Sequence, residues 1–212
     1  MVHRAQVTLS MLALVALPAV VEAGPPLICH PFQTGNAQVL PWGEGTGWNT
    51  PDRKYDVQRL TSDTLRLLTP QAPILARMEN MRRATIYAAQ DARIASELLT
   101  AVLARAQSTT AAGAADANAL FDAGYLVESY KQAAALHREN ILFTRDRSSA
   151  AGFAGAGDGY SMVLRAIALA GGSPDMEFAA SLMKEGAVSA EHLRRATAAA
   201  QAGSLLARNL TR

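Results

Sequence analysis

Cysteine is almost absent from this chain of 212 residues, since Cys29 is the only one. A single cysteine cannot form a disulfide within the chain, so no disulfide framework supports the fold. Lysine is also scarce, occurring only at positions 54, 131 and 184. The formal net charge of +2 is too small for the concentrated basic surface of a nucleic-acid-binding protein. We therefore expect no nucleic-acid partner.

Long apolar runs are scarce too, and the one clear run lies at the amino terminus. It covers residues 7–17, about eleven residues, whereas a membrane-spanning helix needs about 20. His3 and Arg4 precede this run, and Val21-Glu22-Ala23 follows it with small residues where a signal peptidase cuts. Such an order is typical of a secretory signal. We expect residues 1–23 to be removed and the rest to be exported, to a bacterial periplasm or to the cell exterior, with no membrane span left.

Residues 24–51 are rich in proline and glycine and hold both tryptophans of the chain, Trp42 and Trp48. Proline and glycine at this density exclude a long helix. Phe32 and the two tryptophans are nevertheless unusual in a disordered tail. We therefore expect an extended, irregular arm whose aromatic side chains dock on the body of the protein.

Residues 52–212 follow a helical pattern, because apolar residues recur at spacings of three and four. Alanine, the best helix former, is the commonest residue, and no stretch alternates with a period of two. Asp116 and Asp158 are suited to begin helices. We expect two helices rather than one across 73–107 and a single last helix across 189–209.

Short connections between these helices imply antiparallel neighbours. The sequence therefore predicts an all-α protein built of antiparallel helix hairpins, as a bundle or a short helical-repeat array. It has three parts, namely a signal peptide at 1–23, the irregular arm at 24–51 and the helical domain at 52–212.

Two segments resemble parts of known helical-repeat families. The segment 120–124, Leu-Phe-Asp-Ala-Gly, resembles the first helix of a tetratricopeptide unit. The segment 166–174 resembles the turn between paired helices of such units. In these features the chain is similar to tetratricopeptide and Sel1-like repeat proteins, and as a whole it is similar to exported bacterial helical proteins. The resemblance implies helix hairpins that present a groove to a peptide or a partner protein.

Cys29 and His30 are adjacent, and a thiolate and an imidazole can bind copper or zinc. The other two histidines beyond the leader, His137 and His192, do not stand at the spacing of a metal motif. A buried thiol beside a surface histidine is the more ordinary interpretation. A metal site at Cys29 and His30 is kept as the alternative.

No motif for a cofactor or for catalysis is recognisable. The glycines at 155–159 precede a helix, where backbone N–H groups can bind a phosphate. A nucleotide-binding fingerprint, however, needs a strand before it, and a helical pattern lies there instead. The carboxylates of Asp122, Glu128, Asp175 and Glu177 form no obvious pair for acid–base chemistry. We therefore expect no cofactor and identify no catalytic residue.

Four residues are candidates for ligand binding. Trp42 and Trp48 flank a glycine-rich segment and could stack on a sugar or a peptide, although aromatic residues more often anchor an irregular arm. Arg82 and Arg83 could hold anionic groups, because a guanidinium matches a carboxylate or a phosphate. Solvated helix faces are the commoner role of such arginine pairs.

Two function classes follow. The first is an exported, non-enzymatic interaction or scaffold module that binds a peptide or a partner protein. The second is a periplasmic metal-binding protein or enzyme that uses Cys29 and His30. The absence of a catalytic motif favours the first.

Overall fold

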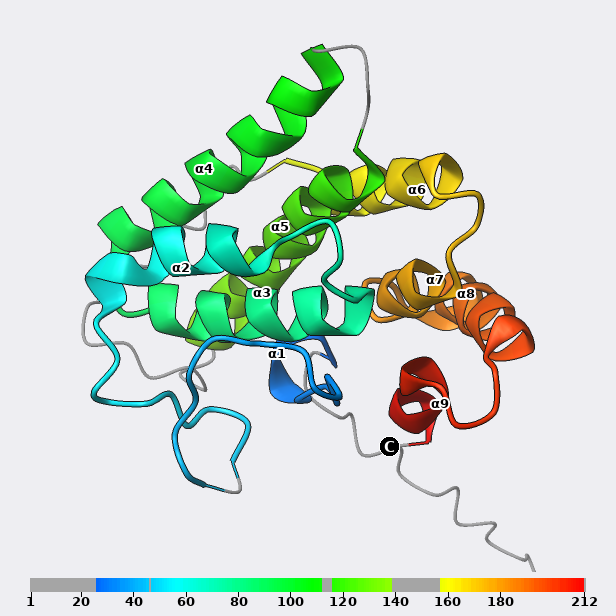
Figure 1. Cartoon of the computed structure of the whole chain (residues 1–212), viewed down its shortest axis with the longest axis horizontal. Helices are drawn as coiled ribbons and strands as arrows, with labels where there is room; N and C mark the ends of the chain where they lie inside the picture. The colour runs from blue at the N-terminus through cyan, green and yellow to red at the C-terminus, as the bar shows by residue number, and fades with distance from the viewer. Residues whose placement is uncertain (1–25, 46, 112–115, 139–156, 212) are drawn as a thin grey trace, which may run out of the picture.

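In the residues that the computed structural model describes, which are 26–45, 47–111, 116–138 and 157–211, the only regular secondary structure is helical. Figure 1 shows these helices, and the all-α prediction is confirmed. The predicted leader and the residues at 112–115 and 139–156 lie outside the described residues, so Gly157 and Gly159 of the glycine-rich segment are described and Gly155 is not. The elements in chain order are α1 (Pro26–Cys29), η1 (Val57–Arg59), α2 (Leu60–Leu67), α3 (Ile74–Ala88), α4 (Ala92–Ala111), α5 (Ala117–Arg138), α6 (Gly159–Leu169), α7 (Pro174–Ser181), α8 (Gly186–Ala199) and α9 (Leu205–Leu210).

Helices α3 and α5 form the centre of the molecule. Helix α5 packs against α3 and α4 on one side and against α6 on the other, so most of its residues are buried. Helix α3 is buried along nearly its whole length, including the charged side chains of Arg77, Glu79 and Arg82. Helices α7 and α8 pack against each other beside the amino-terminal end of α3, with α9 below them in Figure 1.

Several helix starts follow the sequence signals. The Asp116 carboxylate accepts a hydrogen bond from the Asn118 N–H at 2.8 Å, and Asp158 accepts one from the Ser161 N–H at 3.1 Å. Each carboxylate thus satisfies a backbone donor that the first turn leaves free. The expectation of two helices across 73–107 is also confirmed, because α3 ends at Ala88 and α4 begins at Ala92.

The expectation of one helix across 189–209 is wrong. Helix α8 begins earlier, at Gly186, and ends at Ala199, and a separate helix α9 follows. The break occurs because Gly203 adopts φ +75°, a left-handed conformation that glycine tolerates, and because the Ser204 hydroxyl caps α9 by accepting from the Ala207 N–H. Apolar spacing alone did not reveal this turn.

The arm runs along α3, as Figure 1 shows in blue and cyan. Its first residues form one helical turn, α1, which packs against α3 and α5; the rest of the described arm before η1 is irregular. Leu27, Ile28 and Leu40 of the arm are fully buried, so it is part of the core rather than an appendage. None of the described helices is both long and apolar enough to cross a bilayer.

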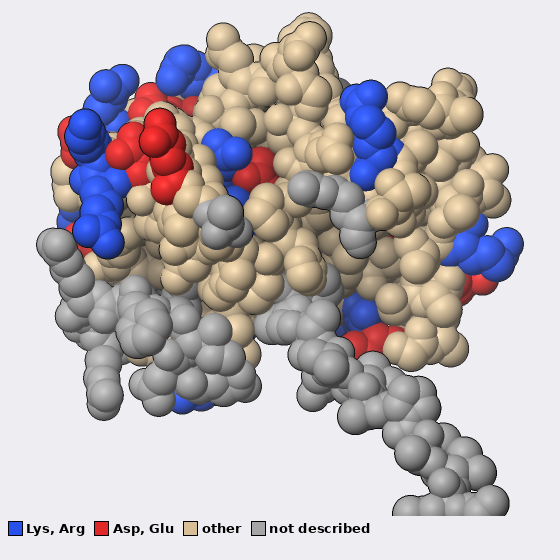
Figure 2. All heavy atoms as spheres, turned by 90° about the horizontal axis from the view of Figure 1, so that it is seen from below, with Lys and Arg blue, Asp and Glu red and all other residues tan. Residues whose placement is uncertain are grey.

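The described surface carries mixed charge. On the face seen in Figure 2, the charged side chains lie in several groups, and most of these groups contain both acidic and basic residues. Wide uncharged stretches separate the groups. This distribution agrees with the formal net charge of +2.

Candidate functional site

The arm is held to α3 by a buried carboxylate, that of Glu79. Its oxygens accept hydrogen bonds from the Arg82 guanidinium at 2.8 and 2.9 Å and from Arg83 Nε at 2.6 Å. The Phe32 backbone N–H of the arm donates to it at 3.0 Å. Burial alone would raise the pKa of Glu79, but the hydrogen bonds from Arg82, Phe32 and Arg83 outweigh it and hold the pKa below its ordinary value of 4.5.

The two arginines also bind the arm directly. Arg82 Nη1 donates to the backbone oxygens of Trp48 at 2.8 Å and Ile28 at 3.3 Å, and Arg83 donates to the Leu40 oxygen. The Trp42 ring lies 4.7 Å from the Arg82 guanidinium carbon and 5.5 Å from that of Arg83. The structure therefore brings Trp42, Arg82 and Arg83 together with the Trp48 backbone, and Arg82 is buried beneath the arm with its donors directed into the protein.

Cys29 lies at the end of α1 and is half-buried, while the next residue, His30, is exposed. Burial raises the pKa of the Cys29 thiol to about 11, even though the nearby Arg82 charge lowers it. The thiol is therefore protonated at neutral pH and is a poor nucleophile. Within the described part of the chain no group of three His, Cys, Asp or Glu side chains is placed to hold a metal ion.

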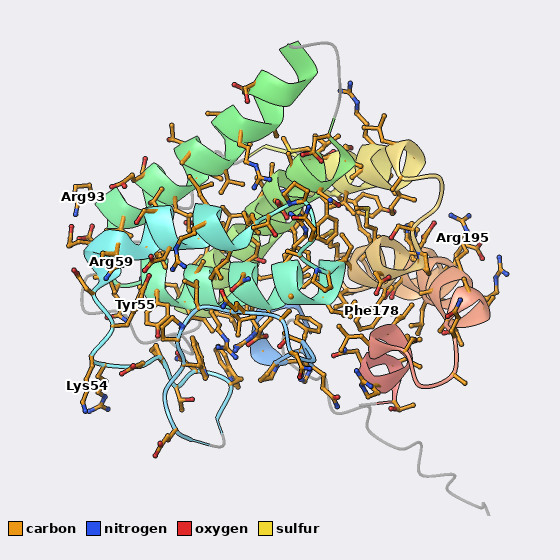
Figure 3. All side chains as sticks on the ribbon, viewed as in Figure 1. Lys54, Tyr55, Arg59, Arg93, Phe178 and Arg195 are labelled. Carbon is orange, nitrogen blue, oxygen red and sulfur yellow. The ribbon has the colours of Figure 1, made fainter. Side chains whose placement is uncertain are left out.

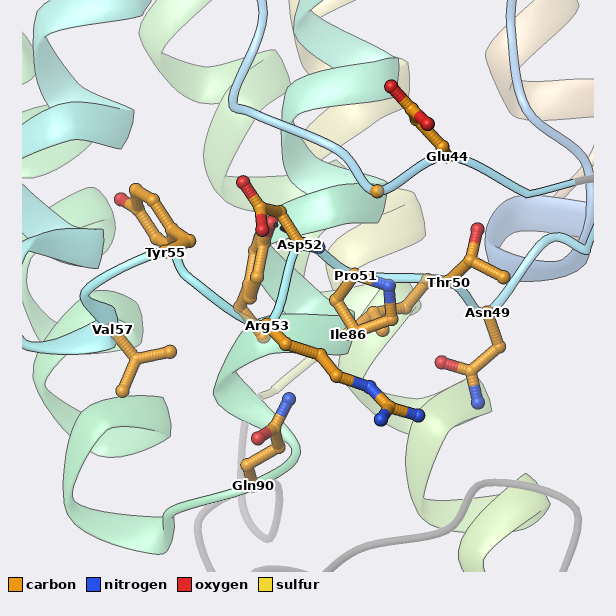
Figure 4. Close-up of a pocket in the computed structure, with 12 residues that line it drawn as sticks. Glu44, Asn49, Thr50, Pro51, Asp52, Arg53, Tyr55, Val57, Ile86 and Gln90 are labelled. Carbon is orange, nitrogen blue, oxygen red and sulfur yellow. Dashed lines mark hydrogen bonds between the residues drawn. The ribbon is translucent and has the colours of Figure 1, made fainter.

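An open pocket of about 1000 Å³ lies between the arm and the carboxyl-terminal end of α3. We call it the arm-edge pocket, and Figure 4 shows the side chains around it. Gly43, Glu44 and residues 49–53 supply one wall, Tyr55 and Val57 a second, and Ile86, Tyr87 and Gln90 the third.

Two contacts shape the arm around this pocket. The Gly43 N–H donates to the Thr50 oxygen at 3.0 Å, and a Cβ at Gly43 would lie only 2.7 Å from that oxygen, so the close approach requires glycine. The Tyr87 hydroxyl accepts from the Asp52 N–H at 3.0 Å and donates to the Pro41 oxygen at 2.8 Å. One buried tyrosine of α3 thus holds both ends of the loop that forms the wall.

Four polar side chains of the pocket make no hydrogen bond or ion pair with any residue that the structure describes; they are Glu44, Asn49, Arg53 and Gln90. In Figure 4 the Arg53 guanidinium extends between the amides of Asn49 and Gln90. All four line the same opening. The site therefore offers donors and acceptors that only solvent or a ligand can satisfy.

The aromatic side of the pocket is rigid. The Tyr55 hydroxyl donates to Asp63 Oδ2 at 3.0 Å, and the Tyr55 ring lies 4.6 Å from the Tyr87 ring. Burial, followed by the hydrogen bond to Asp63, raises the pKa of Tyr55 well above its ordinary value. Tyr55 is therefore a neutral phenol that bounds the pocket.

A second buried polar group links α6, α7 and α8. Tyr160 Oη lies 2.8 Å from His192 Nε2, and His192 Nδ1 is hydrogen-bonded to the Glu177 carboxylate, which also lies 3.5 Å from Arg195. This order of groups resembles a catalytic relay, but His192 is only 5% exposed and none of the three side chains lines the arm-edge pocket. The group fastens three helices together.

The sequence singled out Trp42, Arg82 and Arg83 as candidate ligand-binding residues, but it revealed neither Glu79 and Tyr87, which also hold the arm, nor the side chains that line the pocket. Asn49 and Arg53 are unremarkable polar residues of an irregular segment, and Gln90 lies just after the end of α3. Their shared position depends on the loop closed by Gly43 and Tyr87, which links positions far apart in the sequence. The one available signal was the dense run of polar residues around Pro51, between the last tryptophan and the first helix.

No family model matches this chain, and comparison with curated proteins and with solved structures finds no match. What the chain binds must therefore be inferred from its own residues.

Proposed function

We propose that this chain is an exported, non-enzymatic helical module, and that its arm-edge pocket binds a short peptide segment of a partner protein. The observation that carries the proposal is the set of unpaired polar side chains around one open pocket. Export rests on the predicted leader at residues 1–23. The resemblance to tetratricopeptide and Sel1-like repeats agrees with a binding role and stays a prediction.

A peptide suits the chemistry of the pocket. The side-chain amides of Asn49 and Gln90 each offer a donor and an acceptor, which match the C=O and N–H groups of a peptide bond. Arg53 can donate two parallel hydrogen bonds to a carboxylate. The half-buried Val57 and Pro51 give an apolar surface for a ligand side chain, with Ile86 buried behind them.

A sugar suits the pocket less well, because stacking needs an open aromatic face. Tyr87 is only 1% exposed, and the Tyr55 ring lies against it. Trp42, the other aromatic side chain nearby, contacts the Tyr87 ring edge-to-face and faces the arginines of α3. These rings stabilise the arm rather than provide a free platform.

The arm is also prepared for binding before a ligand arrives. Its backbone is fixed by Glu79, Arg82 and Tyr87, all on the buried helix α3. A pocket held in one conformation loses less entropy when it binds, which favours affinity.

The proposal can be tested by selecting short random peptides on the mature protein. We expect peptides that bind the wild type and bind Arg53→Ala at least about tenfold more weakly, because a hydrogen bond to a charged group contributes about 1.5–3 kcal/mol. Isothermal titration of the selected peptides gives both affinities. Arg53 is exposed, so its removal should leave the fold intact.

Arg165→Ala is the matched control, because Arg165 is an exposed arginine on α6 that does not line this pocket. It should bind the same peptides as the wild type does. Selected peptides that bind all three proteins equally, or a selection that yields no binder, would overturn the arm-edge pocket as a peptide site.

The alternative, a metal protein using Cys29 and His30, is separated by elemental analysis of the purified mature protein. The raised thiol pKa and the absence of a third ligand in the described part of the chain lead us to expect no stoichiometric copper or zinc. Stoichiometric metal that is lost on Cys29→Ser would support the alternative.

A further inference from the structure

A second cavity, of about 580 Å³, lies between residues 30–32 of the arm and helices α7, α8 and α9. We call it the C-terminal groove. Figure 3 labels Phe178 between α7 and α9, and this ring packs edge-to-face on Phe32 with the ring centres 6.2 Å apart. The groove is distinct from the arm-edge pocket, with which it shares no residue.

The walls of the groove are apolar. Phe32 and Phe178 are nearly buried, whereas Leu193 is 41% exposed, an unusual exposure for a leucine that lines a cavity. Further apolar contacts come from Pro31, Leu182 and Leu210. An apolar ligand here would remove the Leu193 side chain from water.

The polar side chains in the walls already use their donors within the protein. Ser181 Oγ donates to the Phe178 oxygen and Ser189 Oγ to the Ser181 oxygen, both at 2.7 Å. The Asn209 amide donates to the Gln33 oxygen at 3.0 Å and accepts from the Gln33 N–H at 2.8 Å. A peptide laid in the groove would lose hydrogen bonds to water and find few to replace them, which is costly.

Two basic side chains remain available at the groove, and no residue that lines it is acidic. His30 is exposed and makes no hydrogen bond with another described residue. The exposed Lys184 ammonium lies 4.4 Å from the Tyr160 ring centre, on a long flexible side chain. A ligand for this groove therefore needs an apolar chain with one anionic end.

We propose that the C-terminal groove binds a medium-chain fatty acid, with its chain against Phe32, Phe178 and Leu193 and its carboxylate at Lys184 and His30. The volume falls within the roughly 300–1,000 Å³ of small-molecule sites. This site is independent of the peptide proposal, since it lies in another cavity and takes another chemistry.

Decanoate is the probe, titrated into the mature protein by calorimetry. We expect saturable binding of one equivalent to the wild type. Binding to Leu193→Glu should be at least about tenfold weaker, because this variant puts a negative charge, of the same sign as that of decanoate, where the alkyl chain would lie. Lys184→Met keeps the aliphatic stem and should weaken binding by about fivefold, as expected for an exposed ion pair. Decanol, which has no charge, should bind more weakly than decanoate.

Two matched controls lie elsewhere on the surface. Leu169 on α6 is 46% exposed and does not line the groove, so Leu169→Glu should bind decanoate as the wild type does. Lys54→Met should do the same, because Lys54 lies between the arm and η1, beside the arm-edge pocket. Wild type that does not bind decanoate, or Leu193→Glu that binds it unchanged, would overturn the site. Equal binding of decanol and decanoate would overturn the role of the charge.

Discussion

At the scale of single residues, this protein depends on charged groups that it buries. The Glu79 carboxylate and the Arg82 guanidinium are both fully inaccessible to solvent, and their hydrogen bonds join the arm to α3. Burying both charges is itself costly, so the pair is not a large net source of stability. Removing one partner is a different matter, because the other charge then stays buried and uncompensated.

Glu79→Gln keeps the shape of the side chain and removes its charge. We expect a loss of about 3–5 kcal/mol in the free energy of unfolding, because Arg82 would remain buried without a counter-charge. Glu97→Gln is the control, since Glu97 pairs with Arg93 on the surface at 3.3 Å and such pairs contribute about 0–1 kcal/mol. Urea unfolding followed by circular dichroism measures both. Similar losses of unfolding free energy in the two variants would contradict the expectation that breaking a buried ion pair costs more than breaking an exposed one.

Asp122 makes the stability depend on pH. Burial raises its pKa from 3.8 to about 6, although Arg77 at 2.7 Å and Arg105 at 3.6 Å lower it. The folded protein thus retains this proton at pH values where the unfolded chain has lost it. The stability that the proton provides is fully present below about pH 4 and is lost as the pH rises through about 6.

The corresponding experiment compares the wild type with Asp122→Asn, which cannot titrate. Between about pH 4 and pH 7 the unfolding free energy of the wild type, relative to that of the variant, should fall by about 2–3 kcal/mol, since one pKa unit corresponds to about 1.4 kcal/mol. The test uses only the change of the unfolding free energy with pH. Asp122→Asn also weakens the interaction with Arg77, and this lowers the unfolding free energy of the variant at every pH. Parallel curves for the two proteins would contradict the raised pKa.

At the scale of helices, α5 and α6 cross in close contact. A Cβ added to Gly124 would lie 2.5 Å from the Gly159 oxygen and 2.9 Å from Val163 Cγ2. The two backbones therefore touch directly, and only glycine allows it. Gly159 begins α6 instead of lying in a flexible linker, so part of the glycine-rich segment has a packing role.

Gly124→Ala separates helix propensity from packing. Propensity alone would stabilise the protein by about 1 kcal/mol, whereas the steric clash should destabilise it by about 1–3 kcal/mol. We expect the clash to prevail, because the nearest atom belongs to backbone and cannot rotate away. Gly47→Ala, where the nearest contact is an ordinary 3.4 Å, should change the melting temperature little. A more stable Gly124→Ala protein would mean that the helices can move apart freely.

The helices also show how much of the structure could be predicted from the sequence. Helix starts at Asp116 and Asp158 were predictable, because capping depends on neighbouring residues only. The break before α9 was missed, since one glycine and one serine interrupt an apolar pattern that otherwise continues. In the site, Trp42, Arg82 and Arg83 were identified separately, but nothing in the sequence showed that Glu79 would join them. That contact, like the convergence of Arg53, Asn49 and Gln90, arises only from the path of the arm.

At the scale of the whole molecule, the arm defines both cavities. Its residues 43, 44 and 49–51 form much of the arm-edge pocket, and residues 30–32 form one side of the C-terminal groove. Trp42 is only partly buried, so Trp42→Ala should lower the free energy of unfolding by less than the loss of a fully buried tryptophan would. The arm is held chiefly by its backbone hydrogen bonds and by Leu27, Ile28 and Leu40.

The predicted leader would end only a few residues before a side chain that the fold buries. Leu27 is fully buried, and its N–H donates to Gln132 Oε1 of α5 at 3.2 Å. A cut after Ala23 leaves this anchor intact, whereas a cut beyond Leu27 would remove it. We therefore expect the exported protein to begin at Gly24, as read by amino-terminal sequencing of material released from the cells.

Two variants make this expectation specific. Ala23→Leu places a large residue where the peptidase needs a small one and should leave the leader attached, while Glu22→Gln, at the neighbouring position that the enzyme does not read, should be processed normally. An exported wild type that retains residues 1–23, or one that begins after Leu27, would contradict the predicted cut. The second result would also contradict the role of Leu27 as an anchor, because the protein would then fold without it.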